Sequence, residues 1–404
     1  LCLKGLSIIA GMLNRARSEM SGLTAPYFLK IAMAVMLLAP GTVHSEEKTQ
    51  WPLFHGDTGL TGYSQTTLPS DMSLLWRTGV GGEVSSCPAA AEGLICCAAG
   101  GANVVALNMK GKKIWTMSAK GGAALTPATI VDGMVIYGSE NGTVTALKCG
   151  DGTKLWEYQT GGAVIGAPNF RKAKDGSSTL IIVLERTEGN IHAIDALSGR
   201  RKWFVRGAAR SDAAPAVGDG RIVYGSCAAQ VHVVSMDLRR KIGDISLGEG
   251  CEAAAPAAVR GTAAYCGDRS GALNRFELPA LKRKWRNTDG EGEMFTVPAV
   301  SGDRVVFSSG TGRIICLKAS DGTLLWSYGS GPCKPVAPVI AGDKVAAVRK
   351  GVLCLLSLET GKMLWKYHVG DQATSPGICG GLLFLGTGAG EVMAFGARTG
   401  LHGP

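Results

Sequence analysis

A proline recurs eight times along this chain at intervals of 38 to 47 residues. The eight positions are Pro88, Pro127, Pro168, Pro215, Pro256, Pro298, Pro338 and Pro376. A large apolar residue follows each of the first seven prolines by 27 to 35 residues. These second markers are Trp115, Trp156, Trp203, Ile242, Trp285, Trp326 and Trp365. A period of about 40 residues with room for four short strands predicts the blades of a β-propeller.

The second repeat shows the unit most clearly. Residues 125–131, 134–138, 143–147 and 154–158 are rich in strand-forming side chains, and Gly, Asp and Asn separate them. Short strands bounded by such turn residues are typical of an antiparallel meander. The 58 glycines of the chain agree with a fold that needs many tight turns.

The two ends of the repeat region complement each other. The last repeat stops after its third strand, near Thr399 and Gly400, and a solitary fourth strand, residues 74–76, precedes the first proline. Pairing these segments would remove an open sheet edge. The sequence therefore predicts an all-β, eight-bladed β-propeller of four-stranded antiparallel blades, with the last blade closed by the N-terminal strand.

The first 45 residues read as a leader. The apolar run 31–39 follows Lys30 and is too short to span a bilayer, so we expect a secretory signal peptide rather than an amphipathic or partly buried helix. Residues 1–19 are expected to be upstream translation, and residues 46–404 to form the propeller. No cysteine lies between residues 3 and 86 to carry a lipid. We expect a periplasmic or extracellular chain that is no lipoprotein and has no transmembrane span after cleavage.

The spacing of three small or aromatic residues resembles a known repeat. Ala146, Gly152 and Trp156 recur as Ala193, Gly199 and Trp203, and this pattern resembles the PQQ-like, or quinoprotein-type, propeller repeat. In that family the tryptophan docks its ring between neighbouring blades. The resemblance assigns this role to Trp76, Trp115, Trp156, Trp203, Trp285, Trp326 and Trp365. In the fourth repeat Ile242 takes the place of tryptophan, so a weaker contact is expected there.

Propellers of this family include quinone-dependent dehydrogenases, outer-membrane assembly scaffolds of the BamB type and extracytoplasmic sensor domains, so the fold alone does not fix the function. We expect an exported, non-catalytic scaffold that acts as a monomer and binds envelope proteins or another anionic surface. Nucleic acid is not expected as a partner of an exported chain. The alternative is a PQQ-dependent dehydrogenase, or a degenerate relative of one, which would need pyrroloquinoline quinone and calcium.

The vicinal pair Cys96-Cys97 is the strongest indication of an enzyme, because quinoprotein dehydrogenases place a vicinal disulfide over the quinone. Here the pair falls within a predicted second strand, which favours two small core residues. The repeat spacings leave no room for insertions that would build a cofactor pocket. The one longer spacing adds the Lys- and Ser-rich loop 171–179, which has no ligand-like pattern. We therefore expect no bound cofactor.

The remaining cysteines and the histidines predict no metal site. The cysteines do not recur at matching repeat positions, and most are expected to be buried free thiols. His192 and His232 occupy corresponding places in adjacent repeats, but neighbouring blades diverge from the axis. We expect partly exposed histidines rather than ligands to one ion.

Three consecutive repeats carry a cluster of cations at the turn into the outermost strand. We name these nine residues the basic stripe: Arg200, Arg201, Lys202, Arg239, Arg240, Lys241, Lys282, Arg283 and Lys284. The net charge of the whole chain is only +10, so the grouping of nine cations in this stripe is distinctive. It would suit an anionic partner such as an acidic protein face or a lipid headgroup. The alternative is that these charges only protect an exposed strand edge.

Overall fold

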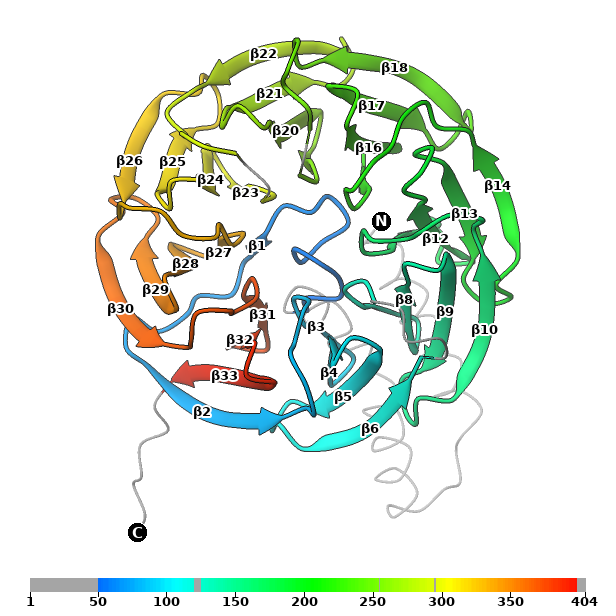
Figure 1. Ribbon diagram of the computed structural model, residues 1–404, viewed down its shortest axis with the longest axis horizontal. Coiled ribbons are helices and arrows are strands. Elements are labelled where there is room, and N and C mark those ends of the chain that lie inside the picture. The colour runs from blue at the N-terminus through cyan, green and yellow to red at the C-terminus, as the bar shows by residue number, and fades with distance from the viewer. Residues whose placement is uncertain (1–49, 120–124, 254, 294–295, 398–404) are drawn as a thin grey trace, which may run out of the picture. The chain divides into compact units, whose positions relative to one another are not determined.

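Eight blades of four antiparallel strands form a closed ring (Figure 1). The sheet of blade seven gains a fifth strand, β1 (Tyr63–Ser64), which pairs parallel with the innermost strand, β27 (Val339–Ala341). The computed structural model describes residues 50–119, 125–253, 255–293 and 296–397, all within one compact unit. The predicted leader, residues 1–45, lies outside the described residues. The all-β, eight-bladed propeller predicted from the repeat is confirmed. No helix among the described residues is long and apolar enough to cross a membrane.

Each blade runs from an innermost to an outermost strand. Blades one and two contain β3 (Ala89–Ala91), β4 (Leu94–Ala99), β5 (Asn103–Asn108), β6 (Lys113–Ser118), β7 (Thr129–Val131), β8 (Met134–Gly138), β9 (Thr143–Lys148) and β10 (Lys154–Gln159). Blades three and four contain β11 (Asn169–Lys172), β12 (Thr179–Leu184), β13 (Ile191–Asp195), β14 (Arg201–Val205), β15 (Ala216–Gly218), β16 (Arg221–Ser226), β17 (Gln230–Ser235) and β18 (Arg240–Ser246). Blades five and six contain β19 (Ala258–Arg260), β20 (Ala263–Gly267), β21 (Leu273–Glu277), β22 (Lys282–Asn287), β23 (Ala299–Ser301), β24 (Arg304–Ser308), β25 (Ile314–Lys318) and β26 (Leu324–Tyr328). Blades seven and eight contain β27 (Val339–Ala341), β28 (Lys344–Arg349), β29 (Val352–Ser357), β30 (Met363–His368), β31 (Gly377–Cys379), β32 (Leu382–Gly386), β33 (Glu391–Ala397) and β2 (Met72–Gly79).

The innermost strands are shorter than the sequence predicts. We expected a strand over residues 125–131, but β7 spans only Thr129–Val131, and Leu125 contributes an isolated bridge to Ser139. Each recurring proline comes just before its inner strand, because proline has no N–H to donate to a strand ladder.

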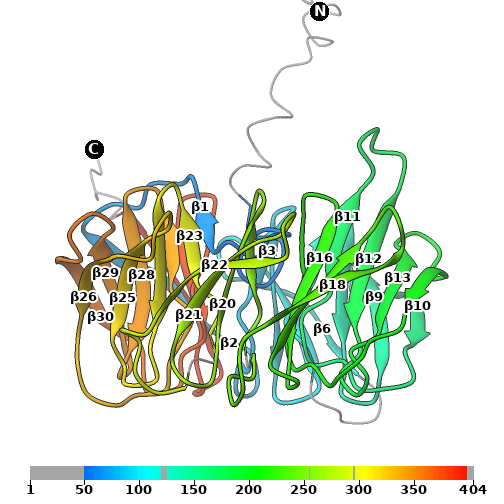
Figure 2. The same cartoon turned by 90° about the horizontal axis from the view of Figure 1, so that it is seen from above.

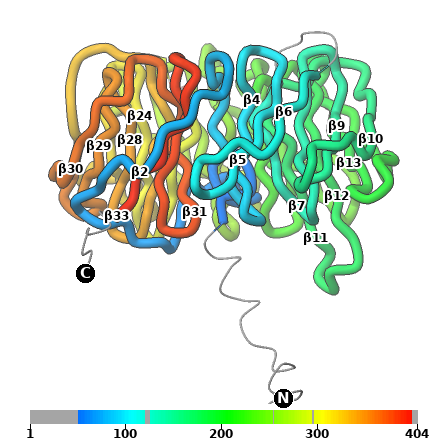
Figure 3. Tube along the Cα trace, turned by 90° about the horizontal axis from the view of Figure 1, so that it is seen from below, coloured from blue at the N-terminus to red at the C-terminus, as the bar shows by residue number. Residues whose placement is uncertain are grey.

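The N-terminal strand closes the ring as predicted. β2 pairs antiparallel with β33, and Trp76 lies opposite Ala394. Figure 3 shows this blue strand beside the red C-terminal strand. The pairing leaves blade eight with the same four strands as its neighbours, so no open edge remains in the ring.

The segment 51–62, which precedes β1 (Tyr63–Ser64), lies across the centre of the ring (Figure 1). Trp51, Leu53 and Leu60 of this segment are fully buried. Its backbone bonds the inner strands of seven blades. The contacts are Trp51 with Ala90, Pro52 with Ile130, Thr58 with the Asn169 side chain and with Val217, Gly59 with Val259, Thr61 with Val300, and Gly62 with Ile340. One short segment therefore ties the inner ends of the blades together.

A repeated tryptophan–glycine contact joins the outer parts of the blades. The Trp156 ring of blade two lies against Gly199 of blade three, where an added Cβ would come within 2.7 Å of it. The indole N–H of Trp156 also donates to the Ala196 carbonyl at 2.8 Å. Gly199 has a φ of +67°, which favours glycine at this turn. The other tryptophans that make both contacts are Trp76, Trp115, Trp285 and Trp326, which meet Gly111, Gly152, Gly322 and Gly361.

Blade four departs from this arrangement, at a different residue from the one we expected. The strand register places Val233 opposite Gly243, as Ala146 lies opposite Trp156 in blade two. Gly243, and not Ile242, therefore occupies the tryptophan position, and Ile242 falls at the irregularity in the strand. In blade five Leu281 stands where other blades have the docking glycine, and its Cδ1 lies 2.2 Å from where a Cβ on Gly243 would be. A leucine from the next blade thus fills the space of the missing ring.

This exchange predicts non-additive stability effects. Gly243→Trp alone should destabilise the propeller by about 1–3 kcal/mol, because the new ring would overlap Leu281. Leu281→Gly alone should also destabilise it, because the apolar contact is lost. The double variant restores the usual pair, so it should be more stable than the sum predicts by about 1 kcal/mol or more. Denaturant unfolding of the four proteins measures this coupling.

The matched control combines Gly243→Trp with Leu197→Gly, a change in an exposed turn of another blade. That pair should be additive. Additive behaviour of the Gly243 and Leu281 changes would contradict the assigned contact.

Candidate functional site

The basic stripe lies on the outermost strands of three consecutive blades. Seven of its residues begin β14, β18 and β22, and Arg200 and Arg239 end the turns that lead into β14 and β18. Figure 1 shows the three strands following one another along the outer rim. Eight of the nine side chains are exposed, and Lys241 is half-buried. The structure thus groups the three clusters in one sector.

Most cations of the stripe have no acidic partner among the described residues. Lys202 pairs with Asp195 at 3.4 Å, and Lys241 pairs with Asp244 at 2.9 Å. The Arg201 guanidinium lies 5.4 Å from the centre of the Phe204 ring. The six that form no ion pair within the described part of the chain and hold no neighbouring carbonyl are Arg200, Arg201, Arg239, Arg240, Lys282 and Lys284. Their positive charge is therefore available to an outside partner.

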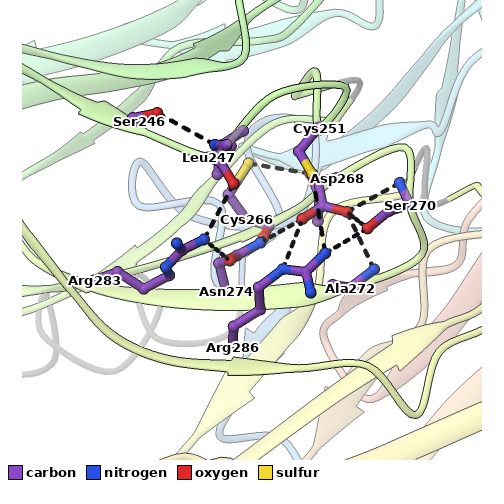
Figure 4. Close-up of polar contacts among 12 residues, drawn as sticks. Ser246, Leu247, Cys251, Cys266, Asp268, Ser270, Ala272, Asn274, Arg283 and Arg286 are labelled. Atoms are coloured by element: carbon purple, nitrogen blue, oxygen red, sulfur yellow. Dashed lines mark hydrogen bonds and ion pairs between the residues drawn. The ribbon is translucent and has the colours of Figure 1, made fainter.

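Arg283 differs, because a buried polar network holds it in place (Figure 4). Its Nη1 donates to the Leu247 carbonyl at 3.1 Å and to Oδ1 of Asn274 at 3.2 Å. The Asn274 amide donates in turn to Asp268, whose side chain is fully buried. Arg286 approaches the same carboxylate at 3.6 Å. Charge neutralisation of Asp268 by Arg286 allows a carboxylate to lie inside blade five, and Arg283 serves the fold rather than the surface.

The two strand histidines are buried, contrary to our expectation of partial exposure. His192 is 2% exposed and His232 is fully buried, because neighbouring strands and blades cover the third strand on both faces. His192 Nδ1 lies 2.9 Å from the Tyr158 hydroxyl of blade two. The two rings belong to different blades and have separate partners. Among the described residues no group of three His, Cys, Asp or Glu side chains could hold a metal ion.

His232 forms a serine–histidine–aspartate arrangement within blade four. Its Nδ1 lies 2.6 Å from Oδ1 of Asp244, and its Nε2 lies 2.9 Å from the Ser226 hydroxyl. These are the contacts of a hydrolytic triad. Ser226 is fully buried, however, so a substrate cannot reach its hydroxyl. The arrangement links β16, β17 and β18 and has a structural role.

Burial of His192 predicts a specific acid sensitivity. Desolvation and the nearby Arg201 charge lower the pKa of His192 from 6.5 to about 4. The unfolded chain therefore binds a proton at a higher pH than the folded chain does, and stability falls as pH decreases from about 6.5 to 4. His192→Phe should reduce the slope of unfolding free energy against pH by up to about 1.4 kcal/mol per pH unit in that range. Denaturant titrations at several pH values measure the slope, and an unchanged slope would contradict this assignment.

Cys96 and Cys97 are both fully buried on β4. Neighbouring residues of a strand point to opposite faces. Cys96 packs toward blade two in one apolar cluster, and Cys97 packs toward blade eight in another. Burial raises the pKa of the Cys97 thiol to about 12. The two thiols are separate core side chains.

A cavity of about 580 Å³ opens near the axis at blades one, six, seven and eight. Glu83 and Asp371 are its carboxylates, and Lys334 and Lys350 are its cations. Cys96 and Cys97 do not line it. The lining adds the Gln372 amide to these two carboxylates, and two carboxylates and one amide fall short of the roughly six to eight oxygen ligands that calcium takes. The donor set of the cavity does not fit the calcium and quinone that the dehydrogenase alternative requires.

Sequence reasoning missed four features of these sites. The axial cavity is built from loops of different blades, and the Asp268 network and the Ser226 contact depend on strand register. The fourth feature is a pair of exposed leucines, Leu197 and Leu238, beside the basic stripe. Aligning the turns of all repeats would have found them, because the turns of blades two, six and seven carry acidic residues there.

Comparisons with known proteins agree on one family. The sequence profile described as outer membrane protein assembly factor BamB matches residues 68–241 and 187–401. Outer membrane protein assembly factor BamB of Yersinia pestis is 25% identical over 314 residues, which cover 70% of this chain and 77% of that protein. The crystal structure of BamB from Moraxella catarrhalis superposes with a TM-score of 0.69 at 17% identity, over 82% of this chain and 100% of that one. Quinohemoprotein alcohol dehydrogenase from Comamonas testosteroni gives a TM-score of 0.70 at 14% identity, over 90% of this chain and 83% of that one, which shows a shared fold only.

Proposed function

Because the chain belongs to the family of the outer membrane protein assembly factor BamB, we propose that it is a non-catalytic scaffold of the cell envelope. In this proposal the exported propeller acts as a monomer and binds its partners through its surface. The names of its relatives support an assembly role. The burial of Ser226 and the thiols of Cys96 and Cys97 removes the catalytic groups that the sequence and fold offered.

The observation that carries the proposal is the group of unpaired cations of the basic stripe. Charge that served only to protect a strand edge would be expected on all eight outermost strands. Here the outward residue before the docking tryptophan is apolar in blades one, two, six, seven and eight. These residues are Ile114, Leu155, Leu325, Leu364 and Leu75, all exposed. Blade one has Lys110, Lys112 and Lys113 at this turn, but a run of three consecutive cations occurs there only in blades three to five. The three adjacent runs therefore favour recruitment of an anionic envelope partner.

Neutralising the unpaired cations tests this role. Replacing Arg200, Arg201, Arg239, Arg240, Lys282 and Lys284 by Gln should leave thermal unfolding nearly unchanged, because exposed charges contribute little to folding. Co-sedimentation with envelope membranes should fall by more than tenfold. Binding of the unaltered protein to these membranes should also weaken with added salt. Salt shortens the electrostatic screening length to about 8 Å near physiological ionic strength.

The matched control removes six exposed lysines from the rims of blades one, two and seven: Lys110, Lys112, Lys113, Lys154, Lys362 and Lys366. It has the same net charge as the test variant and should sediment like the unaltered protein. Equal loss in both variants would show that only net charge matters and would contradict a site on blades three to five.

The second candidate function is quinone-dependent oxidation. The shared fold with quinohemoprotein alcohol dehydrogenase and the axial cavity favour it. We expect the purified chain to bind no stoichiometric quinone when pyrroloquinoline quinone and calcium are added, because the cavity lacks a calcium donor set. Absorbance after gel filtration and dye-linked alcohol oxidation measure the result. Quinone binding that disappears in a Cys96→Ser, Cys97→Ser double variant would overturn the scaffold proposal.

A further inference from the structure

The turns beside the basic stripe end in exposed apolar side chains. Leu197, in the turn between β13 and β14, is 89% exposed. Leu238, in the corresponding turn of blade four, is 58% exposed. In blade five the turn presents Pro279 and Ala280, which are also exposed. Each apolar tip is followed within a few residues by a cluster of the stripe.

The same turns of three other blades have acidic tips. Asp151, Asp321 and Glu359 are the exposed residues at these positions in blades two, six and seven. In blade one the turn has the half-buried Met109, followed by Lys110, Lys112 and Lys113. An exposed apolar tip followed by three consecutive cations is thus confined to blades three to five among the turns that the structure describes. These three turns differ from the turns of the other blades in their amino-acid composition and not in the course of their backbone.

These turns share one end of the propeller. In a four-stranded meander the first and third turns lie at the same end of the sheet. The hairpin between β11 and β12 projects at that end beyond its neighbours (Figures 2 and 3). This hairpin carries Lys174, which is exposed. The projecting hairpin adds a further cation to the same side.

Four acidic residues nearby are already paired with other cations, whereas Asp175 of the projecting hairpin is exposed and, among the described residues, bonds only to Ser177. Asp195 pairs with Lys202, and Asp244 pairs with Lys241. Two further pairs join Asp237 to Arg171 and Asp219 to Arg221. The six unpaired cations of the stripe therefore keep their positive charge beside the apolar tips.

We propose that the turn tips of blades three to five rest on an anionic phospholipid bilayer, with Leu197 and Leu238 entering the headgroup region and the unpaired cations meeting lipid phosphates. This inference rests on the proposed envelope function and names the partner of the basic stripe. Cations near an anionic bilayer attract it over a screening length, and apolar side chains among them add affinity.

The shape of the surface favours a bilayer over a protein. Neither the axial cavity nor a second cavity at blades one and two includes a residue of these turns. The two leucines project into solvent, with exposures of 89% for Leu197 and 58% for Leu238. A protein partner is anchored by side chains that fill pockets, whereas a bilayer yields to projecting groups and needs no matching shape.

Vesicle sedimentation tests the proposal. The probe is a vesicle of phosphatidylglycerol mixed with phosphatidylcholine, with pure phosphatidylcholine as reference. The chain should bind the anionic vesicles at least tenfold more tightly than the neutral ones, and added salt should weaken this binding. Gln at the six unpaired cations should reduce binding about 100-fold or more. Leu197→Ser with Leu238→Ser should reduce it roughly tenfold at unchanged charge.

The matched control for the leucines is Leu155→Ser with Leu364→Ser, which are 48% and 39% exposed on blades two and seven. This control should bind like the unaltered chain. Equal binding of both leucine variants would overturn the lipid assignment. Failure to bind lipid vesicles, while envelope membranes are still bound through the basic stripe, would also overturn it. The second outcome would identify an acidic protein as the partner and leave the scaffold proposal standing. Loss of binding to envelope membranes as well would contradict both.

Discussion

The contact between a tryptophan of one blade and a left-handed glycine of the next is the interaction on which the ring depends. It combines ring burial with an indole N–H···O=C bond, so it fixes both the spacing and the angle of adjacent blades. Its geometry requires that the glycine lack a Cβ, as at Gly152, where a Cβ would come within 2.8 Å of the Trp115 ring. This steric requirement explains why a glycine precedes the tryptophan by four residues in most repeats of the sequence.

The central segment performs the complementary task at the axis. Inner strands of three or four residues leave little ladder for pairing, and neighbouring blades offer one another few partners there. Segment 51–62 supplies the missing hydrogen bonds to seven blades. Closure of blade eight by β2 continues from this segment, so the first described residues both fill the axis and complete the rim. Stability is thus shared between the two ends of every blade.

The sequence predicted what depends on local repetition. Prolines and tryptophans at a regular spacing were sufficient for the number of blades and for the closure by residues 74–76. Features set by contacts between repeats were predicted less well. His192 and His232 have the alternation of half-buried strand residues, but adjacent strands and blades cover both. A shift of one residue in the turn of blade four concealed that Gly243, not Ile242, replaces the tryptophan.

The candidate sites show the same difference between features set by local repetition and features set by contacts between repeats. The basic stripe could be predicted because its members are clustered in sequence and recur in successive repeats. The axial cavity could not, because it gathers residues of the central segment and of loops of several blades, which are up to about 320 residues apart. The Ser226–His232–Asp244 contact likewise needs the register of three strands. Its burial, which denies it a catalytic role, is visible only once the neighbouring strands are in place.

The contact between blades three and four, which lacks the docking glycine, coincides with the basic stripe. Arg239 holds the docking-glycine position of blade four with a φ of +52°, a conformation that disfavours a residue with a Cβ. The indole N–H of Trp203, which should dock there, donates to no carbonyl among the described residues, unlike Trp156 one blade earlier. Blade four therefore has a strained turn at Arg239, and the indole hydrogen bond of Trp203 is missing within the part of the chain that the structure describes, at the place where a cation lies on the rim. Local rules of a fold are broken most often where a surface serves another purpose, which supports a binding role for this sector over simple edge protection.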